Sequence, residues 1–246
     1  MPILQNRTKP SSGAYEMNRC ANATIPVFLQ LNPHPMEKPV IILGAKGIAH
    51  PALEIFNSNQ VIVFGLLDED VKVHGTEINN IPVLGGTEDE GFLKLIGKKT
   101  EAFVAVDDTK YRKFLVELLL ENRKMQPINA IHERAYIATD AALGHGNFIN
   151  AQVTVGAGAT VGSHCIFHTG VIIDHHVTVE DYVQVGAGSI VNADVVLEEG
   201  AFIGSGVTIV SGVRIGAGAR VGAGSVVISS VEKNETVFGN PATKIK

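Results

Sequence analysis

Two adjacent residues, Asp174 and His175, are the side chains in this sequence best suited to general base catalysis. A neutral imidazole, with an ordinary pKa of about 6.5, can accept the proton of an attacking amine or hydroxyl group. A neighbouring carboxylate can orient the ring and stabilise the imidazolium that forms. On spacing alone, an exposed histidine in a turn is the more frequent explanation, so the pair gives a hypothesis and not yet a site.

A group of three histidines could instead hold a zinc ion for hydration chemistry, as in the β-helix carbonic anhydrases of the γ class. Those enzymes hold two of their ligands five residues apart. The histidines of this region contain no such pair; they are His132, His145, His164, His168, His175 and His176. We therefore predict no metal site.

A glycine-containing turn, Gly44 to Gly47, follows a predicted strand, Pro39 to Leu43, and precedes a helix-like segment. A strand, a glycine turn and a helix start place backbone N–H groups where a phosphate can bind. Lys46 replaces the middle glycine of the G-x-G-x-x-G pattern, so an ordinary turn explains the sequence as well. Asp68 follows the second predicted strand, Val61 to Gly65. A dinucleotide-binding fold places a ribose-binding carboxylate there, although a strand-end Asp also commonly caps a turn.

The third predicted strand, Ala102 to Val106, ends at Asp107 and Asp108. These two carboxylates would repel a diphosphate unless a cation or Lys46 intervened. The helix expected from about Lys110 to Arg123 places its apolar residues on one buried face. Those apolar residues are Phe114, Leu115, Leu118 and Leu119. Alternating strands and helices predict a small parallel sheet with helical cover, a Rossmann-like domain over residues 39–130.

Residues 135–230 divide into sixteen unbroken blocks of six, and the third place of every block is Ile, Leu, Val or Phe. A period of six fits neither a helix nor a plain strand and is typical of a parallel β-helix. Each rung of such an array is stable only because its neighbours cover it. We predict a β-helix domain over residues 131–246, with Val231 to Lys246 as a C-terminal cap. Cys165 stands at the first place of its block, where small side chains pack inward.

The length of 246 residues is sufficient for two domains with separate cores. A net charge of −5 and a pI of about 6.0 argue against a general nucleic-acid binder. The sequence has two cysteines, no apolar run long enough to span a bilayer and no signal-peptide pattern. These features predict a soluble cytoplasmic protein without structural disulfides and without a membrane partner. Residues 1–38 are rich in turn residues and are expected to form an arm of unknown role.

Three segments of the second half carry a family resemblance: NFINAQ through VIIDHHVTVEDYVQVGAGSIV, AFIGSGVTIVSGVRIGAGARVGAGSVV, and the tail VFGNPA. They resemble the hexapeptide-repeat sugar acetyltransferases that carry a small nucleotide-binding domain in front. These are the sialic acid O-acetyltransferases and the bacterial N-acetyltransferases for nucleotide-linked 4-amino sugars. The resemblance covers about residues 39–246 and implies a left-handed β-helix, a homotrimer, and acetyl-CoA in the groove between neighbouring subunits. The family's catalytic turn is present as Ile173-Asp174-His175, so the resemblance assigns the general base to His175.

The resemblance also implies three blocks per coil, so that residues three blocks apart stack along one edge. Ala187, Ser205 and Ala223 then form a column of small residues, along which the thin pantetheine arm of CoA could lie. The family binds CoA near the positions that match Ser205 and Ala223. Gln184 stands where the family often has a histidine that contacts the acetyl group. Ordinary turn chemistry explains the same small residues, because they fill that place in most blocks.

Four positions depart from the family pattern. His176 follows the base where some members have Glu, and His168 precedes it where they often have Asn. In the front domain, Ile48 replaces a histidine of the sugar-nucleotide loop, and Asp107 replaces a glycine after the third strand. These changes leave acetyl transfer intact and argue against a uridine-diphosphate sugar. The residues expected to bind the acceptor are Lys46, Gly47, Ile48, Asp68, Glu69 and His168.

The sequence thus predicts an acetyl-CoA-dependent acetyltransferase for an amino or hydroxyl group of a sugar, which is expected to be nucleotide-linked. The expected mechanism is direct transfer, with His175 as the general base, Asp174 beside it and no acyl-enzyme. Two alternatives stay open. One is a β-helix acyltransferase for a free amino acid or a small alcohol. The other is a non-catalytic solenoid scaffold whose glycine-rich edge serves only its turns.

Overall fold

The structure, a computed structural model, describes residues 38–245. The predicted N-terminal arm and Cys20 lie outside these residues, apart from Lys38. Among the helices of residues 38–245, none combines the length and the apolar character that crossing a membrane requires.

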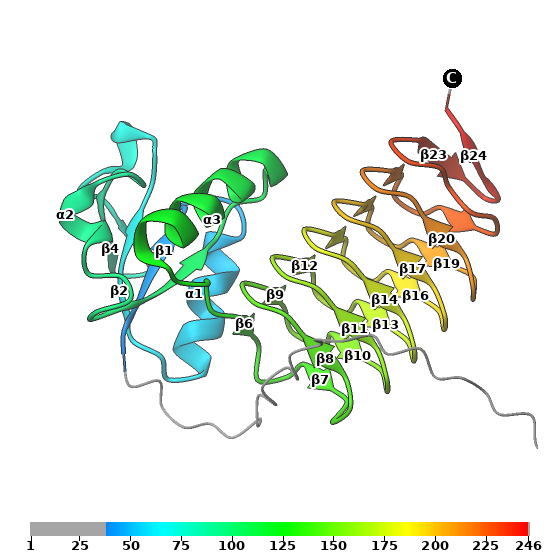
Figure 1. Cartoon of the computed structure of the whole chain (residues 1–246), viewed down its shortest axis with the longest axis horizontal. Helices are drawn as coiled ribbons and strands as arrows, with labels where there is room; N and C mark the ends of the chain where they lie inside the picture. Colours follow the sequence, from blue (N-terminus) through cyan, green and yellow to red (C-terminus); the bar gives the residue numbers. More distant parts are fainter. Residues whose placement is uncertain (1–37, 246) are drawn as a thin grey trace, which may run out of the picture. The chain divides into compact units, whose positions relative to one another are not determined.

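The front part of the described chain is a five-stranded sheet with helical cover (Figure 1). Its strands are β1 (Val40–Leu43), β2 (Val63–Leu67), β3 (Glu77–Ile78), β4 (Ile81–Gly85) and β5 (Glu101–Val104). Its helices are α1 (Ala49–Ser58), the 3-10 helix η1 (Val71–Val73), α2 (Glu90–Leu93) and α3 (Thr109–Arg123). The order is β3-β4-β2-β1-β5, and only the β3–β4 pair is antiparallel. The loops after β1, β2, β4 and β5 therefore meet at one edge of the sheet, where open α/β sheets bind ligands.

The predicted buried face of helix α3 is confirmed in part, because Leu115 and Leu119 are buried and Leu118 is partly buried. Phe114 is 43% exposed, so its predicted place in the core is wrong. Arg112 is buried instead, because its Nη1 donates to the backbone carbonyls of Val106 at 2.7 Å and Asp107 at 3.0 Å. Such bonds offset much of the cost of removing a charge from water. The other buried residues of the helix are Leu115, Val116 and Leu119.

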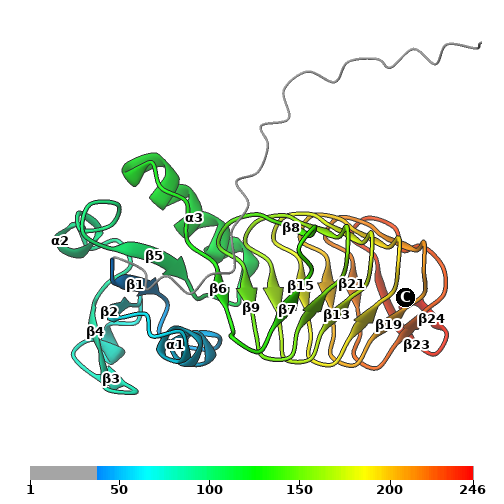
Figure 2. The ribbon, with the colours of Figure 1, turned by 90° about the horizontal axis from the view of Figure 1, so that it is seen from below.

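The hexapeptide array forms a parallel β-helix whose coils follow one another along the chain (Figures 1 and 2). Each block from residue 135 contributes a two-residue strand from its second and third places. The strands, including one before the first block, are β6 (Ala130–Ile131), β7 (Tyr136–Ile137), β8 (Ala142–Leu143), β9 (Phe148–Ile149), β10 (Thr154–Val155), β11 (Thr160–Val161), β12 (Ile166–Phe167), β13 (Ile172–Ile173), β14 (Thr178–Val179), β15 (Gln184–Val185), β16 (Ile190–Val191), β17 (Val196–Leu197), β18 (Phe202–Ile203), β19 (Thr208–Ile209), β20 (Arg214–Ile215), β21 (Arg220–Val221) and β22 (Val226–Val227).

Strands three blocks apart pair in parallel and in register, as Thr154 of β10 does with Ile172 of β13. The pairing produces three sheets, which contain β7-β10-β13-β16-β19-β22, β8-β11-β14-β17-β20 and β6-β9-β12-β15-β18-β21. The third-place side chains, such as Ile173 and Val191, are buried in one continuous core. The parallel β-helix is therefore confirmed, and the arrangement fits the left-handed form that the resemblance implies.

The chain after the last block closes the open end of the β-helix, as the sequence predicts. Strand β23 (Thr236–Gly239) pairs in parallel with β21, and β24 (Ala242–Lys244) folds back antiparallel to β23. Phe238 packs directly against Gly222, where an added side chain would meet its ring. Unpaired strand groups of the last coil are thus covered by the chain itself.

The front sheet and the first coils of the β-helix share a hydrophobic cluster. Phe148 and Ile166, which point outward from β9 and β12, are buried together with Phe56 and Phe103 of the front part. Helix α3 adds an ion pair between Lys113 and a glutamate of the β-helix, Glu199. The front domain is therefore held against the β-helix by apolar burial, the term that dominates such contacts.

A buried histidine in this region makes stability sensitive to pH. His164 is 6% exposed and stacks on Tyr182 with ring centroids 5.0 Å apart. Burial lowers the pKa of His164 from 6.5 to about 4. Because the unfolded chain binds a proton near pH 6.5 and the folded chain only near 4, acid favours unfolding. Linkage gives a cost of about 2 kcal/mol by pH 5 that is absent above pH 7.

We therefore expect His164→Asn to lose about 2 kcal/mol less than the wild type between pH 7 and pH 5 in urea unfolding. Asparagine tolerates the left-handed backbone of this position, whose φ is 61°. The variant will lose ring packing at every pH, so the slope against pH is the informative quantity. His145→Asn, at an exposed neighbouring position, is the control and should keep most of the wild-type slope, because His145 makes the smallest contribution to the lowered pKa of His164. Equal slopes for all three proteins would contradict the prediction.

Candidate active site

The predicted base, His175, lies on an outer edge of the β-helix, in the turn after β13. Its side chain is 53% exposed and that of Asp174 is 44% exposed. His175 Nδ1 lies 3.0 Å from Asp174 Oδ1, and the backbone N–H of His175 donates to the same oxygen at 2.7 Å. With the ring proton on Nδ1, the lone pair of Nε2 is free to accept a proton. The hydrogen bonds from His175 hold the pKa of Asp174 below its ordinary value, so this carboxylate stays ionised beside the ring.

The predicted CoA column lies on a second edge, formed by the turns after β15, β18 and β21. Ala187, Ser205 and Ala223 are all exposed there. Glycine amides link the coils, because Gly206 N donates to the carbonyl of Ala187 at 2.9 Å and Gly224 N to that of Ser205 at 2.8 Å. We call this edge the column edge and the edge of His175 the base edge.

Backbone amides distinguish the column edge from the third edge of the β-helix, formed by the turns after β8, β11, β14, β17 and β20. Within residues 38–245, the N–H groups of Ala187, Ser205 and Ala223 have no hydrogen-bond partner. On the third edge, four of the five amides at the same place in the block donate to side chains, and within residues 38–245 only that of Asp181 has no partner. The donors and acceptors there are His145 to Ser163, Ser163 to Asp181, Glu199 to Glu180, and Ala217 to Glu198. The column edge therefore offers a row of free donors to a ligand that carries amide carbonyls.

Gln184 lies on the outer surface of β15, next to the column edge. Its Nε2 is 3.4 Å from Nε2 of His168, which comes from the preceding coil. Burial lowers the pKa of His168, so its ring stays neutral at ordinary pH and can accept the proton of the amide. Phe148 meets the His168 ring edge-on, with centroids 6.2 Å apart. His168 can thus orient the side chain of Gln184, the residue predicted to contact the acetyl group.

The base edge and the column edge flank one sheet of the β-helix, the one that runs from β7 to β22. Its outward side chains include three exposed apolar residues, Tyr136 at 64%, Ile172 at 39% and Ile190 at 37%. His175 and the column are thus separated by the width of a sheet within one chain. One site could contain both His175 and the column only if a second copy of the chain placed its base edge next to the column edge of the first.

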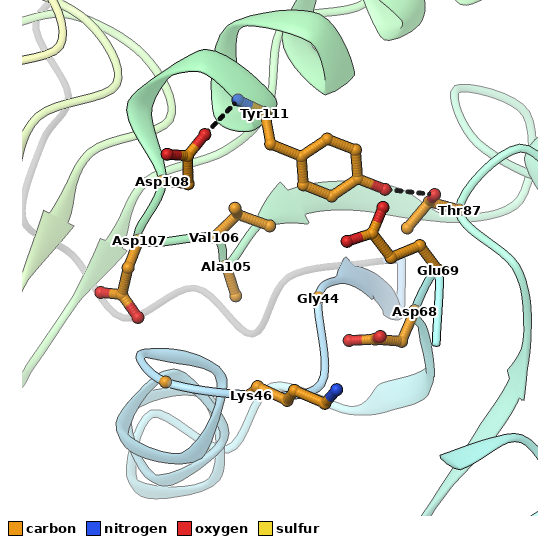
Figure 3. A pocket seen from close by; sticks show the side chains of 11 residues that line it. Gly44, Lys46, Asp68, Glu69, Thr87, Ala105, Val106, Asp107, Asp108 and Tyr111 are labelled. Atoms are coloured by element: carbon orange, nitrogen blue, oxygen red, sulfur yellow. Dashed lines mark hydrogen bonds between the residues drawn. The ribbon is translucent and has the colours of Figure 1, made fainter. Parts of the chain in front are cut away.

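The front domain holds a cavity of about 410 Å³ at the carboxyl-terminal edge of its parallel strands. Figure 3 shows Lys46 below the cavity, Asp68 and Glu69 after β2, and Tyr111 of α3 hydrogen-bonded to Thr87. The remaining lining residues are Gly44, Gly47, Ala105, Val106, Asp107 and Asp108. Four carboxylates and one lysine line the cavity, and that lysine is already paired, because Lys46 Nζ lies 2.7 Å from Asp70. The hydrogen bond to Asp70 raises the pKa of Lys46, while that from Lys46 lowers the pKa of Asp70.

The structure brings together most of the residues expected to bind the acceptor. Lys46, Gly47, Asp68 and Glu69 line the cavity. The side chain of Ile48 is buried, and only its backbone N–H faces the turn. His168 does not line the cavity; it lies on the β-helix beside Gln184. Sequence reasoning missed two lining residues, Thr87 and Tyr111. Thr87 follows β4, a strand that was not predicted, and the place of Tyr111 in the cavity depends on its hydrogen bond to Thr87.

The sequence also raises two other candidates, the thiol of Cys165 and a metal site. Cys165 is buried, and burial raises the pKa of its thiol to about 12, so it does not supply a thiolate at ordinary pH. No group of three or more His, Cys, Asp or Glu side chains in residues 38–245 is arranged to hold a metal ion.

Comparison with known proteins adds independent findings to this geometry. The family model described as bacterial transferase hexapeptide (six repeats) matches residues 194–229. A variant of GDP-perosamine N-acetyl transferase from Caulobacter crescentus, solved with CoA and GDP-perosamine, is 28% identical with a TM-score of 0.78. The alignment covers 85% of this chain and 98% of that one. This chain therefore resembles the hexapeptide-repeat sugar acetyltransferases in both its repeat and its fold.

Two structures of lower sequence identity share the fold of this chain. The acetyltransferase domain of PglB from Neisseria gonorrhoeae, in complex with acetyl coenzyme A, is 23% identical with a TM-score of 0.77, over 85% of this chain and 99% of that chain. WeeI from Acinetobacter baumannii AYE is 24% identical with a TM-score of 0.76, over 85% of this chain and 100% of that chain. No curated protein matches the sequence. The repeat match and the likeness to the Caulobacter enzyme support an enzyme of the acyltransferase class.

Proposed function

We propose that this chain transfers the acetyl group of acetyl-CoA directly to an amino or hydroxyl group of a sugar. The observation that carries the proposal is an exposed His175 whose Nδ1 is held by Asp174, leaving Nε2 free. The free amides of the column edge and the complexes of the Caulobacter enzyme with CoA and GDP-perosamine support it. Amino sugars with and without a linked nucleotide are accordingly the acceptors to compare.

The chemistry of the proposed step follows from the free Nε2 of His175. The acceptor nitrogen or oxygen attacks the thioester carbonyl, and Nε2 takes the acceptor's proton as the new bond forms. The tetrahedral intermediate then collapses, the carbon–sulfur bond breaks, and the proton passes to the thiolate of CoA. Asp174 stabilises the imidazolium between these two proton transfers. No acyl-enzyme is needed, and the buried Cys165 takes no part.

The column edge is the proposed binding surface for CoA. Pantetheine is long, thin and rich in amide groups, so it can pass over Ala187, Ser205 and Ala223 and accept hydrogen bonds from their N–H groups. Larger side chains at these positions would block its path. Gln184 lies near the end of this path and can donate to the thioester oxygen, where backbone amides near Ala187 would stabilise the developing negative charge.

We further propose that the active assembly is a homotrimer with a left-handed β-helix in each subunit. The base edge of one copy would then face the column edge of its neighbour. The exposed apolar residues between these two edges, Tyr136, Ile172 and Ile190, support burial of this sheet face against another copy. The front sheet would serve as a Rossmann-like domain that binds the acceptor in its cavity.

Thiol release from acetyl-CoA tests the proposed function. We expect release to require an added acceptor, and to be faster with nucleotide-linked amino sugars or free amino sugars than with serine. Serine as the best acceptor would favour the enzyme of small non-sugar acceptors and would overturn the sugar assignment. A calorimetric titration with CoA tests the scaffold alternative, because a scaffold has no reason to bind CoA. Absence of both CoA binding and thiol release would contradict the proposal.

A further inference from the structure

The turn between β1 and α1 is occupied by carboxylates of the chain itself. Ala45 N donates to Oδ2 of Asp68 at 2.7 Å, and Ile48 N donates to Oδ2 of Asp107 at 3.3 Å. Asp68 is only 7% exposed, and its other oxygen accepts the N–H of Asp70 at 2.9 Å. Figure 3 shows the Asp107 carboxylate directed toward the start of α1.

This position is the one at which a strand–turn–helix unit would hold a phosphate. The N-terminus of a helix carries free N–H groups and a partial positive charge, and both attract an anion. Here Asp107 supplies that anion from the loop after β5. Its approach requires the glycine beside it, because a side chain at Gly47, whose φ is 53°, would collide with the Asp107 carboxylate. The turn is therefore shaped around Asp107.

The remaining groups of the turn do not restore a phosphate site. Gly44 N donates to the carbonyl of Leu67 at 2.7 Å. The amides of Lys46 and Gly47 lie in the sequence between the two that bind carboxylates, so a diphosphate reaching them would meet two like charges. The Lys46 ammonium, which could offset those charges, is paired with Asp70 at 2.7 Å. Like charges at contact distance in a half-buried site repel strongly.

We infer that Asp107 is a specificity-determining residue that keeps a diphosphate out of the glycine turn. The acceptor is then a sugar that carries no diphosphate into this turn. This assignment of the acceptor rests on the proposed acetyl transfer. It is recognised in the cavity through its hydroxyl or ammonium groups, which donate hydrogen bonds to carboxylates.

Two substitutions separate the charge of Asp107 from its volume. Asp107→Asn keeps the shape and removes the charge, whereas Asp107→Gly also empties the position. Asp108→Asn is the matched control, because it removes the same charge from the same cavity. Asp108 caps α3 by accepting the N–H of Tyr111 at 2.8 Å, and asparagine caps a helix equally well. Thermal unfolding of each variant checks that it is folded.

The experiment is a calorimetric titration of each protein with GDP and with UDP, with and without Mg²⁺. We expect weak or undetectable binding by the wild type, at least about tenfold tighter binding by both Asp107 variants, and a change of less than about threefold for Asp108→Asn. Micromolar binding by the wild type under either condition would overturn the inference. So would unchanged weak binding by the folded Asp107 variants, since another barrier would then exclude the diphosphate.

The same proteins assayed for thiol release keep the two proposals apart. Tighter GDP binding by the Asp107 variants, with no thiol release from any protein and acceptor, would refute the proposed acetyl transfer and leave the role of Asp107 standing. If the wild type instead released thiol faster with a nucleotide-linked sugar than with the free sugar, the proposed acetyl transfer would stand and the proposed role of Asp107 would be refuted.

Discussion

Replacing His175 with alanine is expected to lower the turnover number at least about a hundredfold, which corresponds to about 2.7 kcal/mol of lost transition-state stabilisation. The reason is the free Nε2 on an exposed ring, since no other group of the base-edge turn combines a free lone pair with a carboxylate partner at 3.0 Å. Single-turnover thiol release at saturating acetyl-CoA and acceptor measures the effect. The affinity for CoA, measured by calorimetry, should change little because the proposed pantetheine contacts come from the backbone of the column edge and not from the His175 ring.

Two further variants make the His175 result specific. His145→Ala removes an exposed histidine from the third edge and should leave turnover unchanged. Asp174→Asn keeps the shape of the turn but weakens the partner of Nδ1, so we expect a smaller loss of turnover and an altered pH profile. Near-normal thiol release by His175→Ala would refute its assignment as the base.

Adding a single methyl group at Gly204 is expected to destabilise the β-helix by ~3 kcal/mol or more. A Cβ atom at this glycine would lie 2.6 Å from the backbone N of Ala223 and 2.8 Å from its Cα, atoms of the next coil that cannot move aside. Because each coil is stable only through its neighbours, the strain acts on the whole stack. Urea unfolding of Gly204→Ala measures the change, and the variant should also bind CoA more weakly because the column passes through Ala223.

Gly206 provides the matched control for Gly204, since it lies two residues further along the same turn. A Cβ atom there would meet nothing within 4 Å, and its φ of 67° is one that asparagine tolerates. Asp194 and Tyr182 adopt the same backbone at the same place in their blocks. We expect Gly206→Asn to cost less than about 1 kcal/mol. A stability for Gly204→Ala equal to that of Gly206→Asn would show that the coils can separate to accept a side chain.

The sequence predicts the β-helix well because its period records a local rule. The third residue of each six-residue block, such as Ile173 or Val191, packs inward, and each coil repeats the geometry of the coil before it. The exposed place of His175 follows from the same rule, since its turn lies past the inward column. The six-residue period does not predict which backbone amides of the turns form hydrogen bonds. Only coordinates reveal that Ala187 keeps a free N–H while Ser163 gives its own to Asp181.

The front domain is harder to predict, because its decisive contacts join distant segments. The charge of Asp107 is visible in the sequence, but its bond to Ile48 N spans 59 residues. Burial of Arg112 depends on the carbonyls at the end of β5 and not on the apolar period of α3, which places Phe114 inside by mistake. The β3–β4 hairpin is short and β4 contains Pro82, which weakens a strand prediction, so Thr87 and the cavity wall that it forms went unpredicted.

The tail that closes the β-helix has a consequence for the CoA column. Gly222 N donates to the carbonyl of Val237, and Gly239 N donates to Oγ of Ser225, so the coil that carries Ala223 is fastened directly to β23. We therefore expect a truncation that removes β23 and β24 to loosen this coil, and with it the proposed CoA contact at Ala223, before it affects the turn of His175. The C-terminal cap would then decide how far along the β-helix the proposed CoA surface extends.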